Sequence, residues 1–143
     1  MADEERMLMD RLAGLVHRPG MQACLAQIAG ALRAQLKGDS QAKSTCAPLP
    51  LELYGPELPD GIRSSWVFVL REGLRHPAER HPNSIQRMFA LDGQGAMEIW
   101  SGGAWRWCPL ETGPDAPGLS IPVLQWHRPA MRIAISPCSS PSP

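Results

Sequence analysis

The sequence carries no net charge, because its 14 basic residues balance 14 acidic ones along 143 residues. A nucleic-acid or anionic-membrane partner needs a concentrated basic surface, so we exclude both partners. No apolar run approaches the length that spans a bilayer. The acidic start, MADEERMLMD, lacks the hydrophobic segment of a secretory signal. We therefore expect neither membrane insertion nor export.

Paired cysteines and the common catalytic motifs are also missing. The four cysteines are far apart and form no C-x-x-C pair, which argues against a thiolate zinc site. We interpret them as reduced thiols of a cytoplasmic protein. The sequence has no P-loop, G-x-G-x-x-G, H-E-x-x-H or G-x-S-x-G motif. The absence of these motifs argues against a nucleotide-binding site, a metalloprotease site or a serine-hydrolase site of the usual kind.

The first third of the chain has helical periodicity. Leu8, Leu12, Leu15 and Val16 form one apolar stripe, which predicts a helix over residues 3–17. A second helix is predicted over residues 20–37, and residues 37–48 have the polar composition of a linker. Residues 1–43 are thus expected to be a helical N-terminal segment.

The rest of the chain is predicted to be β-rich. Short runs of β-branched and aromatic residues alternate with turn signals rather than with helices, which is typical of an antiparallel sandwich or barrel. A hairpin through the Ser-Gly-Gly turn joins two of the runs. The Pro/Ser-rich residues 137–143 are expected to be disordered. Strands are predicted within residues 65–72, 84–93, 96–100, 104–110, 119–123 and 131–136.

Four polar residues of the β-rich part are candidate metal ligands. Glu79 and His81 are two positions apart, so in an extended segment both side chains point the same way. His127 and Gln86 could add an imidazole and an amide oxygen. His76, five positions from His81, is expected at the surface. The alternative is that Glu79 and His81 are solvated loop residues and that His127 is structural.

This stretch resembles the first sequence motif of the cupin superfamily, G-x5-H-x-H-x4-E-x6-G. Gly73, His81 and Gly93 stand at the spacings of that motif. Glu79 stands where the family has its first histidine, and Gln86 stands where it has its glutamate. The two replacements nearly conserve the charge of the ligand set.

The second cupin motif, P-x-G-x2-H, is also similar to a stretch of this chain. Pro122 and His127 match it, and Leu124 replaces its glycine. The resemblance covers about residues 60–136. It implies a mainly β protein, a cupin-type jelly-roll β-barrel over residues 49–136, preceded by the two N-terminal α-helices.

The resemblance further implies a divalent metal ion inside the barrel. Glu79, His81 and His127 would bind it directly, and two histidines with one carboxylate are the donor set of non-haem iron oxygenases. Gln86 would be a weak fourth ligand or a hydrogen-bond partner of the site. Iron is expected first, then manganese, nickel or zinc.

The resemblance implies two functions that remain open at this point. One is a metal-dependent enzyme acting on a small organic molecule, with dioxygenase-like or isomerase-like chemistry. The other is a non-catalytic cupin that binds or senses a small ligand after losing its metal-dependent activity. Cupins commonly pair, so a homodimer is implied in either case.

Four further residues are candidates for the walls of a substrate pocket: Arg87, Trp66, Trp100 and Trp126. An inward arginine could clamp a substrate carboxylate in a bidentate pair, and tryptophans could form an aromatic wall. Trp105 and Trp107 alternate and share a face. The competing interpretation is that the arginine is solvated and the tryptophans pack in the core and the hairpin.

Overall fold

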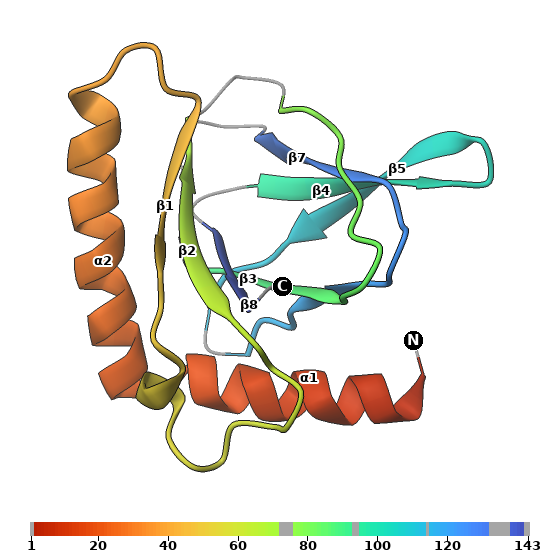
Figure 1. Ribbon diagram of the computed structural model, residues 1–143, viewed down its shortest axis with the longest axis horizontal. Helices are drawn as coiled ribbons and strands as arrows, with labels where there is room; N and C mark the ends of the chain where they lie inside the picture. The colour runs from red at the N-terminus through yellow and green to blue at the C-terminus, as the bar shows by residue number, and fades with distance from the viewer. Residues whose placement is uncertain (1, 72–75, 93–94, 114, 132–137, 142–143) are drawn as a thin grey trace.

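The computed structural model describes residues 2–71, 76–92, 95–113, 115–131 and 138–141, which form two helices and two antiparallel sheets (Figure 1). The helices are α1 (Asp3–Val16) and α2 (Pro19–Lys37), and a 3-10 turn spans Leu51–Tyr54. The strands are β1 (Ser44–Pro48), β2 (Ser65–Leu70), β3 (Gln86–Ala90), β4 (Gly95–Ser101), β5 (Ala104–Leu110), β6 (Leu119–Ile121), β7 (His127–Met131) and β8 (Cys138–Pro141). No helix in these ranges is both long and apolar enough to cross a membrane.

Both predicted helices are confirmed, and they cover one face of the larger sheet. Each helix has an apolar stripe, and Pro19 begins α2, where its missing N–H is not needed. Leu12 and Leu25 are buried together with Val67 of β2 and Phe89 of β3 in one core cluster. In Figure 1, α2 runs beside β1 and β2 while α1 crosses below them.

The strands divide into a sheet of order β1-β2-β8-β3-β6 and a smaller sheet of order β5-β4-β7. The predicted hairpin is confirmed: Ser101 pairs with Ala104 across a turn made by Gly102 and Gly103. Both glycines have positive φ, 62° and 83°, which a two-residue hairpin turn requires. The hairpin extends away from the helices (Figure 1).

A second core cluster lies between the two sheets and contains Leu70, Met88, Met97 and Ile121. Successive side chains of a strand point to opposite faces. In β3, therefore, Met88 and Gln86 point between the sheets, whereas Arg87 and Phe89 point toward the helices. This alternation places Gln86 in the interior.

Several sequence predictions need correction. Residues 44–48 of the expected linker form β1, and residues 138–141 of the expected disordered tail form β8, which pairs with β2 and β3. Neither segment has strong strand-forming composition, so the pairing with stronger neighbours decides its structure. The predicted strand 131–136 begins with Met131, the last residue of β7, and the remainder lies outside the described residues. The described strands form two facing sheets and no closed barrel.

Candidate metal centre

Two separate segments of the chain meet at the candidate site. Glu79 and His81 lie in the segment before β3, and His127 is the first residue of β7. Glu79 and His127 form an isolated antiparallel bridge. The Glu79 N–H donates to the His127 carbonyl at 2.8 Å, and the His127 N–H donates to the Glu79 carbonyl at 3.0 Å. Backbone pairing thus holds the two segments side by side and brings the Glu79 and His127 side chains near one another.

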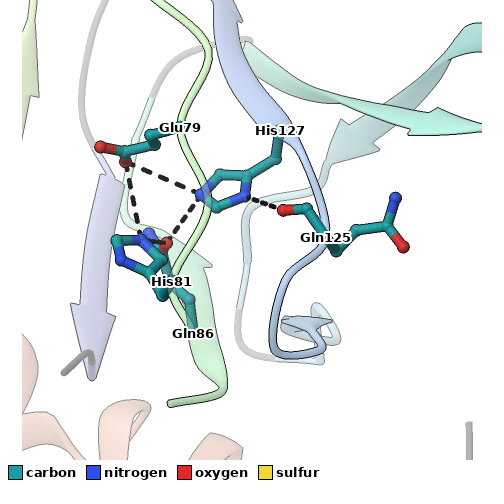
Figure 2. Close-up of polar contacts among 5 residues, drawn as sticks. All are labelled: Glu79, His81, Gln86, Gln125 and His127. Carbon is teal, nitrogen blue, oxygen red and sulfur yellow. Dashed lines mark hydrogen bonds and ion pairs between the residues drawn. The ribbon is translucent and has the colours of Figure 1, made fainter. Parts of the chain in front are cut away.

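The three predicted donors converge (Figure 2). One ligand atom from each of Glu79, His81 and His127 lies within 4.8 Å of the other two. The Glu79 Oε1 atom is 3.8 Å from His81 Nε2 and 3.7 Å from His127 Nε2. In the described part of the chain, this is the group of at least three such donors that could hold one ion.

The site runs from the interior to the surface. The His127 side chain is 1% exposed, that of His81 29% and that of Glu79 57%. The interaction with His127 is the main cause that lowers the pKa of Glu79 below its ordinary 4.5, and desolvation opposes it. At 3.7 Å this contact is longer than a hydrogen bond, and it is an ion pair only when the His127 ring is protonated. The carboxylate is therefore held ionised at the open end of the site.

A backbone carbonyl orients the His127 ring. Its Nδ1 atom lies 2.9 Å from the Gln125 oxygen, which can only accept, so Nδ1–H is the donor. In the neutral ring, the lone pair is then on Nε2, the atom that faces Glu79 and His81. Sequence reasoning did not find Gln125, because a backbone contact leaves no mark in residue type.

The Gln86 carboxamide bridges the two imidazoles. Its Oε1 atom lies 2.8 Å from His81 Nε2 and 2.9 Å from His127 Nε2. An amide oxygen accepts, so this orientation requires a proton on both nitrogens. Rotated by half a turn, the same amide would donate its two N–H groups to two unprotonated nitrogens. Gln86 can thus satisfy the histidines in either state.

The predicted pocket residues are not gathered at the site. Arg87 points to the helix side of β3, where both its Nε and one Nη contact the Glu5 carboxylate of α1 at 2.8 Å. The expectation that it clamps a substrate is wrong for this geometry, because strand alternation turns it away from Gln86. Trp66 is on the inner face of β2, the same face as Phe68 and Leu70.

Trp100 and Trp126 are exposed on the outer side of the smaller sheet, opposite the inward His127. They are neither pocket walls nor core, because each is one residue out of phase with the inward positions. His76, expected at the surface, is buried. Gly73 and Gly93 of the first motif lie outside the described residues.

Searches with the sequence itself found no match: no family model and no curated protein corresponds to it. Solved structures do match. A recombinant oxalate oxidase in complex with glycolate superposes with a TM-score of 0.54 and 15% identity, over 72% of this chain and 52% of that one. A second structure, an oxalate oxidase in complex with the substrate analogue glycolate, gives a TM-score of 0.52 and 14% identity over 72% of this chain and 53% of that one. This chain therefore spans about half the length of those proteins.

The chain has the cupin fold. KdgF from Halomonas sp. also aligns, with a TM-score of 0.48 and 12% identity over 71% of this chain and 80% of that one. That lower score adds nothing to the fold assignment. The cupin resemblance drawn from the two motifs is thus confirmed at the level of the fold.

The cupin fold explains the backbone at Leu124. This residue occupies the glycine position of the second motif, and its φ is +62°, in the left-handed region that glycine favours. Its N–H donates to the His81 carbonyl at 2.9 Å, so the strained residue holds one ligand segment in place.

Proposed function

We propose that this cupin binds a divalent metal ion through Glu79, His81 and His127 and acts on a small organic molecule. The observation that carries the proposal is the convergence of one carboxylate oxygen and two imidazole nitrogens within 4.8 Å. Two nitrogen donors and one carboxylate suit iron first, and manganese, nickel or zinc as well. The free thiols of Cys24, Cys46 and Cys108 fit a reducing compartment such as the cytoplasm.

The donor set fits such an ion in distance and chemistry. Ligands about 2.1 Å from a metal lie about 3 Å from one another when adjacent. The Glu79 oxygen lies 3.7 and 3.8 Å from the two imidazole nitrogens, less than about 1 Å longer than that, and all three ligand atoms lie within 4.8 Å of one another. Side-chain movements of about 1–2 Å would bring the three donors around one ion.

Each residue then has a defined task. His127, fully buried and oriented by the Gln125 carbonyl, presents a fixed nitrogen lone pair. Glu79 supplies a negative charge that offsets part of the charge of the ion. His81, partly exposed, closes the other side. A bound metal would supply Lewis-acid or oxygen-activating chemistry to a small substrate.

The surroundings favour a small substrate. His127 is paired with Ile99 in the smaller sheet, and Gln86 is paired with Ile121 in the larger one. Both isoleucines belong to or pack against the apolar cluster between the sheets. A substrate group that enters past Glu79 would leave water and meet an apolar wall, where electrostatic interactions are strengthened.

The test is metal content measured on protein purified without a histidine tag. We expect near-stoichiometric metal in the wild type, its loss in Glu79→Ala and His127→Ala, and its retention in His17→Ala, which removes a histidine remote from the site. Metal-free wild-type protein that also fails to take up iron, manganese, nickel or zinc would refute the proposal.

One observation favours the alternative function, a non-catalytic ligand-binding or sensor cupin. The Gln86 amide already satisfies His81 and His127 without an ion. A cupin that had lost its metal would need such a contact, because buried imidazole nitrogens are otherwise left unpaired. Retention of full thermal stability after exhaustive chelation, together with absence of metal, would favour this alternative.

A further inference from the structure

The segment that carries two of the three proposed ligands lies against the edge of the smaller sheet. Glu79 and His81 precede β3 and belong to no strand, and Glu79 forms an isolated bridge with His127 of the edge strand β7. The Leu124 N–H donates to the His81 carbonyl at 2.9 Å. With the two hydrogen bonds of the bridge, three backbone hydrogen bonds join residues 79–81, which we call the ligand segment, to residues 124–127.

Arg80 is the middle residue of the ligand segment, and its side chain lies on the opposite side from the two ligands. Because Glu79 and His81 converge inward, alternation along an extended chain directs Arg80 outward, where it is exposed. Trp126 lies on the same outer side, because it precedes the inward, buried His127. The Arg80 guanidinium carbon is 4.8 Å from the centroid of the Trp126 ring, within the range of a cation–π interaction.

The Trp126 side of this contact is fixed by the smaller sheet. The Trp126 carbonyl accepts a hydrogen bond from the Trp100 N–H of β4 at 3.0 Å. The preceding residue, Gln125, donates from its side chain to the Trp100 carbonyl, and its own carbonyl accepts the Nδ1–H of His127. The ring that contacts Arg80 therefore belongs to the same short stretch that orients the buried ligand.

We propose that Arg80 is a positioning residue of the metal centre. Its cation–π contact with Trp126 keeps the ligand segment against β7, so that the two donors of that segment face His127. Arg80 is bonded directly to both ligand residues of the segment, so a movement of its backbone moves both donors. Among the described residues Arg80 makes no ion pair, so no carboxylate competes with the ring for its charge. The inference rests on the proposed metal function.

The position of Arg80 separates this role from a simple effect of its charge. A positive charge repels a nearby cation, so removal of the Arg80 charge would by itself make a bound divalent ion more stable. Loss of the contact with Trp126 has the opposite effect, because the ion dissociates when the ligand segment leaves β7. Faster loss of the ion after removal of a positive charge is thus a sign of positioning.

The effect of an exposed cation–π contact is small, and it is best measured as local opening. Such a contact changes an opening equilibrium by about two- to fivefold. The N–H groups of Glu79, Leu124 and His127 all donate between the ligand segment and residues 124–127, and we call them the bridging amides. They exchange with solvent when the ligand segment opens, so their exchange rates report this opening directly.

Amide hydrogen exchange followed by NMR on the metal-free protein tests the proposal. We expect the bridging amides to exchange about two- to fivefold faster in Arg80→Gln and in Trp126→Leu, after correction for the intrinsic rates of each sequence. Arg80→Lys keeps a cation over the ring and should stay close to the wild type. The double variant Arg80→Gln/Trp126→Leu should exchange no faster than either single variant, because both changes remove the same contact.

Two controls restrict the effect to the ligand segment. The amide of Val67, in the buried strand β2, should exchange at the same rate in all the variants. Arg63→Gln removes an exposed arginine just before β2 and should leave the bridging amides unchanged. The proposal is overturned if the bridging amides of Arg80→Gln and Trp126→Leu exchange as in the wild type. It is equally overturned if the Val67 amide accelerates as much as they do.

Manganese(II) separates this proposal from the metal function. The rate at which a chelator removes manganese should rise about two- to fivefold in Trp126→Leu, which changes no charge, and should stay near the wild-type value in Arg80→Lys. Equal removal rates in the wild type and Trp126→Leu would overturn the positioning role and leave the metal function intact. A wild type that takes up no metal would remove the metal function, and the exchange rates alone would then decide whether Arg80 holds the donors in place.

Discussion

At the scale of single residues, Leu124 holds a backbone conformation that its side chain disfavours. A non-glycine residue in the left-handed region carries a penalty of about 1–2 kcal/mol. Leu124→Gly and Leu124→Ala both remove the leucine side chain, but only Leu124→Gly also removes the backbone penalty. We predict that the glycine variant is about 1 kcal/mol more stable than the alanine variant, measured by urea unfolding. Equal stabilities would mean that the loop relaxes at no cost.

A second residue-scale prediction concerns His76, which is buried and whose Nε2 has no hydrogen-bond partner in the described part of the chain. Burial, with a smaller contribution from Lys43, lowers the pKa of His76 below its ordinary 6.5, and a hydrogen bond that the His76 ring donates to the Arg71 backbone opposes this shift. The unfolded chain then binds a proton at a pH where the folded chain does not. The contribution of His76 to the unfolding free energy is therefore fully present above pH 6.5 and is lost as pH falls toward the folded pKa of His76.

His76→Phe removes this titration. We predict that the unfolding free energy of the variant falls less than that of the wild type between about pH 7.5 and pH 5, as followed by denaturant midpoints. The rest of the acid sensitivity, which comes from carboxylates, should remain in both proteins. An identical slope in the two proteins would show that His76 is protonated without penalty.

At the scale of elements, a partly buried ion pair connects α1 to the larger sheet. Glu5 of α1 accepts two hydrogen bonds from Arg87 of β3 and one from Ser120 of β6. The hydrogen bond from Arg87 is the main cause that lowers the pKa of Glu5. Its stabilisation is therefore present above the unfolded pKa of a glutamate and is lost as pH falls through the folded pKa.

We predict that Glu5→Gln lowers the unfolding free energy by about 1–3 kcal/mol at neutral pH, because one member of a partly buried charged pair is left behind. The difference from the wild type should shrink as pH falls through the lowered folded pKa of Glu5, below which both proteins are uncharged at this position. Glu4→Gln, at an exposed neighbouring position, is the control. A deficit that persists unchanged in acid would contradict the electrostatic origin.

Helix α1 also depends on one glycine. A Cβ at Gly118 would lie 2.5 Å from Met9 Cε and 2.5 Å from Phe89 Cε1, so an alanine cannot fit without moving the ring or the helix. We predict that Gly118→Ala destabilises by about 1–3 kcal/mol. Gly30→Ala, in the middle of α2 with nothing within 4 Å, should instead stabilise by about 0.5–1 kcal/mol. Thermal unfolding of both variants checks the opposite signs.

How well the sequence predicted each helix or strand depends on how clear its residue pattern is. Helices α1 and α2 and strands β2 to β6 have periodic or β-branched patterns, and they are where the sequence placed them. Strands β1 and β8 lack such patterns and exist through their partners. The convergence of Glu79, His81 and His127 was predictable from motif spacing. The direction of Arg87 required the register of β3, which a single sequence does not fix within one residue.

At the scale of the whole molecule, the Gln86 amide that bridges the two imidazoles would set how strongly the proposed metal ion stabilises the fold. Gln86→Glu adds a carboxylate beside Glu79, which should destabilise the metal-free protein and tighten binding of a divalent ion. We predict a lower melting temperature after chelation and a larger rise on adding manganese than in the wild type, by several degrees. Gln41→Glu, exposed on the surface, is the control. Unchanged responses to chelation and manganese would place Gln86 outside the ion's influence.

The bridge between Glu79 and His127 has a kinetic consequence. Because the donors come from segments far apart in the chain, no short piece of the unfolded polypeptide offers the same set of ligands. An ion bound there would cross-link the two segments and would have to dissociate before the two sheets separate. Its release would then be coupled to global opening, and a loaded protein should resist proteolysis for longer even where its refolding is no faster.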